Sequence, residues 1–495
     1  MYIIFVFSLV SSLLMHFWQR SVDQTPFAWD QMTHLIFTLD YFKLLQEGSF
    51  YDFFYSFDWY TPFVYWVGSL YASFVPHLFL GLVINIFFLT IFLFSLIFFR
   101  TTKKVGHTLL ISLLFLHLIL PQPTSAYWAW LSIRDFLLDI PLALMICALY
   151  TLYLFIEKNR KIDMKTIILF SLFITATNLT KNTGVIYTAP FFLFFTVKIL
   201  ISKENRLKKI IFLSVFLVLI ILQNRWFFIN FKEFQKINNI HLVNGYLEND
   251  PQGLTGLFTN FKWIVSYSPG LNILVLLTFI FFHKKIYKNF RKEKNIVVLP
   301  IYLFLMLLIF SLISNKEPRY ILPLTWLFYY EPSKYLAEKL PEKILFAAII
   351  LLSVLLPLHT FINLSKPRSN QTAYHYIKNM ITVLNPKSMG FFYEIDGPFF
   401  NYASAIYLAK INNLNFHNVN ENHPYVDNEL LKTCNLTDSD LILFVYSTAA
   451  ASTYQDSNDV SFDDVCGKKI SKKCTFYSQK IFSDTDEKVR IFNCK

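Results

Sequence analysis

The hydrophobic positions of this 495-residue chain form long uninterrupted runs and do not alternate with polar positions. Segments 78–99, 105–133 and 344–365 contain no charged residue. An α-helix rises about 1.5 Å per residue, so about 20 apolar residues cross a hydrocarbon layer of about 30 Å. A helix without a polar stripe faces lipid or other apolar helices. The pattern therefore predicts an α-helical polytopic membrane protein.

We expect about eleven membrane-spanning helices. The composition agrees with this class, because 55% of the residues are hydrophobic and only 16% are charged, whereas soluble domains have about 25% charged residues. The predicted spans are 2–18, 78–99, 105–120, 136–156, 166–180, 184–201, 209–228, 269–282, 296–314, 319–331 and 343–362.

The loops between these runs differ in charge. Five short loops, at about 100–104, 158–165, 203–209, 284–294 and 334–343, are rich in Lys and Arg, and the alternate loops are poor in them. Basic loops stay on the cytoplasmic side, so the N-terminus is expected in the cytoplasm and the chain from residue 366 onward outside it. The net charge of +12 then reflects topology, and a nucleic-acid partner is excluded.

Two domains follow from this topology. Residues 1–365 form the membrane module, with a long outer loop at 19–77, and residues 366–495 form a small extracytoplasmic α/β domain. A helix at 370–384 is followed by strand-like runs at 389–393, 441–446, 474–478 and 489–493. Four cysteines fall in this domain, which suggests two disulfides with three pairings open: Cys434, Cys466, Cys474 and Cys494.

Ionisable residues near the bilayer are expensive unless they are paired or functional. In the outer loop, Asp30 and His34 are four residues apart and share a helix face. Asp30 is otherwise a solvated carboxylate or a helix cap. The spacing allows a divalent metal, but two ligands are too few for a closed site, so a metal is the less favoured interpretation, and the sequence points to no particular cofactor.

Three further polar groups lie at predicted outer helix ends. Arg134, Asp135 and Asp139 open the fourth helix, and the alternative for them is an intrahelical Arg–Asp pair. Lys181 lies in a tight turn, where a lone Lys otherwise snorkels to the interface. The last group is a second turn with two cations, which can clamp phosphate oxygens or merely flank a helix: Lys316, Arg319 and Tyr320.

Together these groups have the chemistry of sugar transfer from a lipid phosphate. An acceptor hydroxyl needs a base, and a departing phosphate needs positive charge. A transporter places its polar groups near the bilayer midplane on broken helices, and no such set stands out. Two alternatives stay open: a transporter or flippase of lipid-linked sugars, and a non-catalytic membrane scaffold.

The order of the short motifs over residues 1–330 resembles the GT-C glycosyltransferases. It is most similar to the branch of protein O-mannosyltransferases and bacterial aminoarabinose transferases of lipid A. Asp30 matches the acidic start of an outer-loop helix, and 60–62 matches a Tyr-Pro-Pro-like segment. Segment 139–142 matches an Asp that opens a helix. Two turns follow: a Leu-x-Lys-x-Thr-Gly turn at 179–184 and a Lys-x-x-Arg-Tyr turn before Leu-Pro at 316–323.

The resemblance implies an inverting glycosyltransferase with a polyprenyl-phosphate sugar donor. It implies Asp30 as general base, supported by Asp139, and Lys181 and Arg319 as ligands of the donor phosphate. Many family members have Glu after the first Asp, whereas this chain has Gln31. The acceptor is then a lipid, a polysaccharide or a protein outside the cytoplasm. The excess of Lys over Arg favours a bacterial origin and thus the inner membrane.

Overall fold

The computed structural model describes most of the chain and divides it into two compact units. The first contains residues 1–17 and 38–365, and the second contains 18–37 and 366–495. The described residues are 2–23, 30–57, 60–99, 102, 104–119, 137–159, 162–235, 253–267, 272, 298–313, 318–364, 372–393, 400, 402–418, 439–447, 470, 474–482 and 487–494.

The chain is a polytopic α-helical membrane protein. Among the described residues, five helical segments are long and apolar enough to cross a membrane: α1 (Tyr2–Val22), η1 with α5 (His77–Phe79, Leu80–Phe98), α7 (Asp139–Asn159), α9 (Gly184–Ile201) and α17 (Glu342–Asn363). Four apolar helices are shorter: α4 (Phe63–Ala72), α6 (Val105–Ile119), α8 (Met164–Asn178) and α15 (Val298–Leu312).

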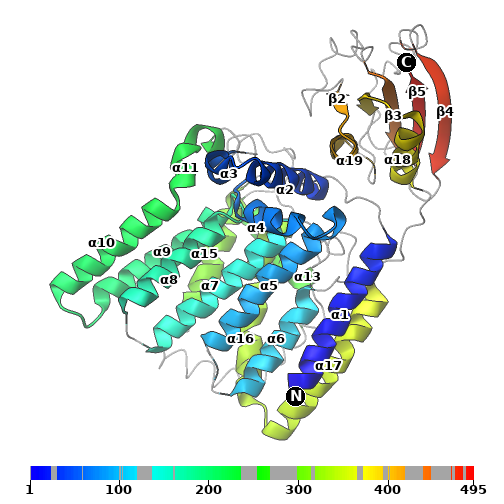
Figure 1. Ribbon diagram of the computed structural model, residues 1–495. Helices are drawn as coiled ribbons and strands as arrows, with labels where there is room; N and C mark the ends of the chain where they lie inside the picture. The colour runs from blue at the N-terminus through cyan, green and yellow to red at the C-terminus, as the bar shows by residue number, and fades with distance from the viewer. Residues whose placement is uncertain are drawn as a thin grey trace. The chain divides into compact units, whose positions relative to one another are not determined.

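Seven further helices of the described residues lie between residues 30 and 339. They are α2 (Asp30–Gln46), α3 (Phe50–Tyr55), α10 (Arg206–Gln223), α11 (Arg225–Ile229), α13 (Gly253–Tyr267), η4 (Pro318–Ile321) and α16 (Leu322–Lys339). Figure 1 shows α8, α9 and α10 side by side, and α1 alongside α17. The hydroxyl of Ser8 on α1 donates to the carbonyl of Ser353 on α17.

Helix α7 forms the centre of the first unit. It packs against α5, α8, α9 and α16, and nearly all of its residues are buried. A helix that is apolar on all sides is expected in such a core position. In α10, by contrast, the buried residues are Phe212 and Phe216 on one face. The rest of α10 is therefore available to lipid.

Most of the predicted spans coincide with helices, and the differences have local causes. The predicted span 209–228 is two helices, because the chain bends at Asn224 between α10 and α11. The predicted span 319–331 begins with η4 and continues to Lys339 in α16. Helix α13 was not predicted, because Asn260 and Lys262 interrupt its apolar run. The predicted span 269–282 lies outside the described residues except for Asn272.

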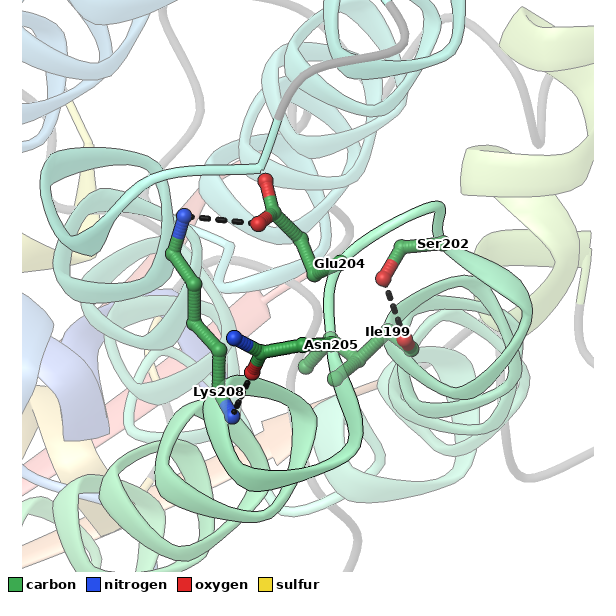
Figure 2. Close-up of polar contacts among 5 residues, drawn as sticks. All are labelled: Ile199, Ser202, Glu204, Asn205 and Lys208. Carbon is green, nitrogen blue, oxygen red and sulfur yellow. Dashed lines mark hydrogen bonds and ion pairs between the residues drawn. The ribbon is translucent and has the colours of Figure 1, made fainter.

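The turn between α9 and α10 is one of the basic loops. Figure 2 shows how its local contacts shape it. The Asn205 side chain caps α10 by accepting the N–H of Lys208 at 2.8 Å, and the Lys208 ammonium pairs with Glu204 at 2.7 Å. The Ser202 hydroxyl donates to the carbonyl of Ile199. Asn at a helix N-cap satisfies an otherwise unpaired backbone N–H, so the helix start is determined locally.

Two other basic loops, those before α6 and before α17, are joined by an ion pair. Lys104, just before α6, pairs with Glu342 at the start of α17. The two helices run alongside each other, so these loops lie at the same end of the helix bundle. The side of the membrane on which they lie stays a prediction from the distribution of charge.

The C-terminal part of the second unit contains a mixed five-stranded sheet. Its order is β2-β1-β3-β5-β4, with β1 (Ser388–Tyr393), β2 (Asn415–Asn418), β3 (Leu441–Ser447), β4 (Thr475–Phe482) and β5 (Glu487–Asn493). Strands β2, β1 and β3 are parallel, and β5 runs antiparallel to β3 and β4. Helix α18 (Ala373–Leu384) contacts β5, and α19 (Tyr402–Ile411) contacts β1 and β2. The helix and four of the strands were predicted, whereas α19 and β2 were not.

The last turn of α1 belongs to the second unit. The helix extends to Val22, four residues beyond the predicted end, so Arg20 is part of it. Burial raises the pKa of Tyr407 to about 12, and the nearby Arg20 guanidinium acts in the opposite direction. Burial raises the pKa of Tyr374 as well, the neighbouring Tyr407 raises it further, and Arg20 acts in the opposite direction. The Arg20 guanidinium also donates to the backbone carbonyl of Asp23 at 3.2 Å.

A disulfide joins Cys474 and Cys494 across the antiparallel edge of the sheet. Cys434 and Cys466 lie outside the described residues, and Cys147 is a buried free thiol in α7.

Removal of the disulfide should loosen this edge. The bond closes a loop of 20 residues, and a crosslink of that span stabilises the folded state by about 3 kcal/mol. We expect Cys494→Ser to accelerate amide exchange in β4 and β5, measured by mass spectrometry, and to leave exchange in α5 and α7 unchanged. Cys147→Ala is the matched control. Unaltered exchange in β4 and β5 would show that packing alone holds the edge.

Candidate functional site

Asp139 and Lys181 form a buried ion pair at one end of the helix bundle. Asp139 is the first residue of α7, and Lys181 lies in the turn between α8 and α9. The Lys181 Nζ is 2.5 Å from the Asp139 Oδ1, and the side chains are only 8% and 4% exposed. The alternative that Lys181 snorkels to the interface is therefore wrong, because its ammonium is held inside the protein.

Tyr320 lies beside this pair and is shared by two cations. The Lys181 Nζ is 4.7 Å from the centre of the Tyr320 ring, and the Arg319 Cζ is 5.5 Å from the same centre. Cations are attracted to the negative face of an aromatic ring within about 6 Å. The second predicted turn thus reaches the first, although 138 residues separate Lys181 from Arg319.

Two further tyrosines support Tyr320 from within the bundle. The Tyr187 hydroxyl, from α9, donates to the backbone carbonyl of Tyr320. The Tyr302 hydroxyl, from α15, donates to the carbonyl of Tyr187 at 3.0 Å. Both tyrosines are fully buried. The sequence gives no signal for these two, because the chain has 28 tyrosines and both of these lie in apolar runs.

Segment 60–63, which the sequence predicts in the outer loop, is hydrogen-bonded to the turn that carries Lys181. The backbone N–H of Thr61 donates to the Asn182 side chain at 3.1 Å, and the N–H of Phe63 donates to the carbonyl of Leu179 at 2.9 Å. Four of the five sequence motifs, those around residues 60, 139, 181 and 319, therefore meet at one end of the first unit.

The other predicted site residues fall either outside the described residues or in the second unit. Arg134, Asp135 and Lys316 lie outside the described residues. Asp30 and His34 begin α2 but belong to the second unit, so their place beside the ion pair stays a prediction. His34 and Gln31 are buried, and Asp30 is half-buried. Over the described part of the chain, no group of three His, Cys, Asp or Glu side chains can hold a metal ion.

An open apolar groove begins next to this cluster. Phe63, one of its lining residues, is hydrogen-bonded to the Lys181 turn through the carbonyl of Leu179. The groove follows one face of α5 from Phe87 to Phe98, a length of about 16 Å at 1.5 Å per residue. Its lining is almost wholly apolar: Phe63, Phe87, Thr90, Ile91, Phe94, Ser95, Phe98, Phe99, Met145, Leu169, Leu172, Phe173 and Ala176.

Comparison with known proteins gives similarity at the level of structure alone. No protein-family model and no curated protein sequence matches the chain. The crystal structure of ArnT from Cupriavidus metallidurans in the apo state matches with a TM-score of 0.61 and 10% identity. The structure of that protein bound to undecaprenyl phosphate matches with a TM-score of 0.58 and 11% identity. Each comparison covers 98% of this chain and 97% of the other.

The fold is GT-C-like. At 10–11% identity the likeness establishes the fold and not the activity. It extends beyond the motifs at residues 1–330 to nearly the whole chain.

Proposed function

We propose that this protein is a membrane glycosyltransferase that moves a sugar, with inversion, from a polyprenyl-phosphate donor to an acceptor outside the cytoplasm. The observation that carries the proposal is the cluster of Lys181, Asp139, Arg319 and Tyr320, in which two cations lie within 6 Å of the centre of one tyrosine ring. A structural neighbour with the same fold binds undecaprenyl phosphate.

The cations suit a leaving phosphate. As the sugar–oxygen bond breaks, the phosphate gains negative charge, and groups aimed at that charge stabilise the transition state more than the ground state. Arg319 offers a planar fork of donors, whereas Lys181 acts as a point charge. Asp139 keeps the buried Lys181 ammonium in one position, because an unpaired buried charge would be very costly.

The apolar groove suits the lipid part of the donor. It adjoins the Lys181 turn through Phe63, so a chain lying in it would have its phosphate end close to the cations. Aromatic and aliphatic side chains such as those of Phe87 and Phe94 offer a polyprenyl chain dispersion contacts and no unsatisfied polar group. Asp30 is the residue we propose as the base that takes the acceptor's proton.

A deletion strain distinguishes a transferase from a flippase. Loss of a transferase should leave intact polyprenyl-phosphate sugar on the outer leaflet, whereas loss of a flippase should leave it on the inner leaflet. Lipid mass spectrometry, combined with a membrane-impermeant reagent that modifies exposed sugars, measures both. Unchanged lipid-linked sugars in the deletion strain would support the scaffold alternative and contradict the proposal.

Arg319→Lys tests the role of the guanidinium. The charge is retained, but the fork that binds two oxygens is lost. Loss of one charge-assisted hydrogen bond costs about 1.5–3 kcal/mol, so we expect kcat/KM to fall by about 10–100-fold. The substrate is the lipid-linked sugar that accumulates in the deletion strain.

Arg225→Lys is the matched control. The Arg225 guanidinium also stacks on a tyrosine, with its Cζ 4.9 Å from the ring centre of Tyr55, but it lies in α11. Its replacement should leave kcat/KM unchanged. Equal kinetics for Arg319→Lys and the wild type would mean that Arg319 only flanks its helix.

A further inference from the structure

A buried network of side-chain amides and hydroxyls joins the ends of the helices that adjoin the Lys181 turn. The Asn178 Nδ2 donates to the Asn224 Oδ1 at 3.0 Å, and the Thr188 hydroxyl donates to the Asn178 Oδ1 at 2.5 Å. The Asn224 Nδ2 in turn donates to the Thr175 Oγ1 at 2.9 Å and to the carbonyl of Ile220 at 2.8 Å. The four polar side chains are at most 7% exposed.

Such a network is expensive to build inside a helix bundle. Each buried amide or hydroxyl must recover the hydrogen bonds that it loses on leaving water. Interhelical polar contacts hold membrane helices together. Here both amides and two hydroxyls, from α8, α9 and the end of α10, converge on one place.

That place is the base of the Lys181 turn. Asn178 is the last residue of α8, three residues before Lys181. Gly184 opens α9, and its N–H donates to the Lys181 carbonyl at 2.7 Å. A Cβ added at Gly184 would lie 2.3 Å from the carbonyl oxygen of Thr177, so α9 starts in direct contact with the end of α8. The turn therefore has little freedom once the ends of α8 and α9 are held.

Asn224 connects this base to the outer-loop elements. It lies at the bend between α10 and α11. In α11, the Trp226 Nε1 donates to the carbonyl of Ser56 at 3.1 Å. The same carbonyl accepts the Tyr41 hydroxyl of α2, also at 3.1 Å. The bend thus connects the Lys181 turn to residues 38–46 of α2, the part of that helix that lies in the first unit.

We propose that Asn178, Asn224 and Thr175 are positioning residues that hold the Lys181 turn so that its ammonium stays on Asp139 and faces the donor phosphate. The second half of this inference rests on the proposed function. The first half, the rigidity of the turn, does not depend on it.

The test uses Thr175→Val and Thr175→Ser in the full-length protein in nanodiscs. Valine keeps the shape of threonine and removes the hydroxyl that accepts from Asn224, whereas serine keeps the hydroxyl. Asn224→Ala removes the central amide. Asn260→Ala, which truncates an equally buried amide in α13, controls for a general loss of stability.

The first measurement is amide exchange of the peptide that contains residues 179–184. Loss of one buried hydrogen bond changes a local opening equilibrium by about tenfold. We expect exchange about tenfold faster in Thr175→Val and Asn224→Ala, and wild-type exchange in Thr175→Ser and Asn260→Ala. Wild-type exchange in both of the first two variants would overturn the proposal.

The second measurement is the affinity for undecaprenyl phosphate, by native mass spectrometry. We expect Thr175→Val and Asn224→Ala to weaken binding about tenfold, with Lys181→Ala at least as weak and Thr175→Ser unchanged. If exchange accelerates but none of the variants, including Lys181→Ala, alters binding, then the positioning stands and the proposed phosphate site is wrong. If Lys181→Ala weakens binding while Thr175→Val and Asn224→Ala change neither measurement, then the positioning is wrong and the phosphate site stands.

Discussion

Replacement of Asp30 with Asn should lower the rate of sugar transfer by about 10²–10⁴-fold, the usual cost of losing a general base. Asn keeps the shape of the side chain and can still donate and accept hydrogen bonds, but it cannot take the proton of the acceptor hydroxyl. Asp30 is a half-buried carboxylate at the first position of α2. The measurement is the single-turnover rate with the lipid-linked sugar from the deletion strain.

Asp40→Asn is the matched control for this experiment. Asp40 lies on the same helix with a similar, intermediate exposure, so its substitution repeats the change of charge at another position. We expect its rate to equal that of the wild type, and undecaprenyl phosphate should bind both variants normally. Transfer by Asp30→Asn at the wild-type rate would remove Asp30 from the mechanism.

The second large effect concerns the pair of Lys181 and Asp139. In Asp139→Leu alone, the Lys181 ammonium would stay buried without its partner, and breaking a buried pair costs about 3–5 kcal/mol. In the double variant Lys181→Met/Asp139→Leu, both charges are replaced by apolar groups of similar size. Such replacements are neutral or stabilising. We therefore expect the double variant to unfold at or above the wild-type temperature and the single variant well below it.

Activity should not follow stability in this series. The double variant keeps the packing but has no cation at the position of Lys181, so transfer should fall as strongly as in Lys181→Ala. Thermal unfolding and kcat are measured on the same protein preparations. A double variant that is both stable and fully active would show that the ion pair has only a structural role.

The Lys181 turn is held by two sets of hydrogen bonds. The N–H groups of Thr61 and Phe63 hold the turn from the outer-loop side, and the network around Asn224 holds it from within the bundle. A group that must meet a transferring phosphate gains from being held in place before the reaction, because little reorganisation is then needed in the transition state.

The apolar pattern of the chain is enough to predict its fold class and several of its elements. Long apolar runs without charge predict helices of a membrane protein regardless of how the helices pack, since the backbone must satisfy its hydrogen bonds within each span. The strands around 389–393 and 441–446 were also readable, because β-branched and aromatic residues cluster there. The short motifs around Asp139, Lys181 and Arg319 were recognised because they interrupt apolar runs with charge at helix ends.

How these motifs combine depends on contacts that the three-dimensional fold alone reveals. Lys181 is 42 residues from its partner Asp139. From the sequence, Asp139 can equally well pair with Arg134, and Lys181 can equally well extend to the membrane interface. The support of Tyr320 by Tyr187 and Tyr302, the bend at Asn224 and the helix α13 were likewise not readable. Each of these depends on contacts between helices that are distant in sequence. Because the apolar runs have similar compositions, the pattern does not reveal which helix faces contact one another.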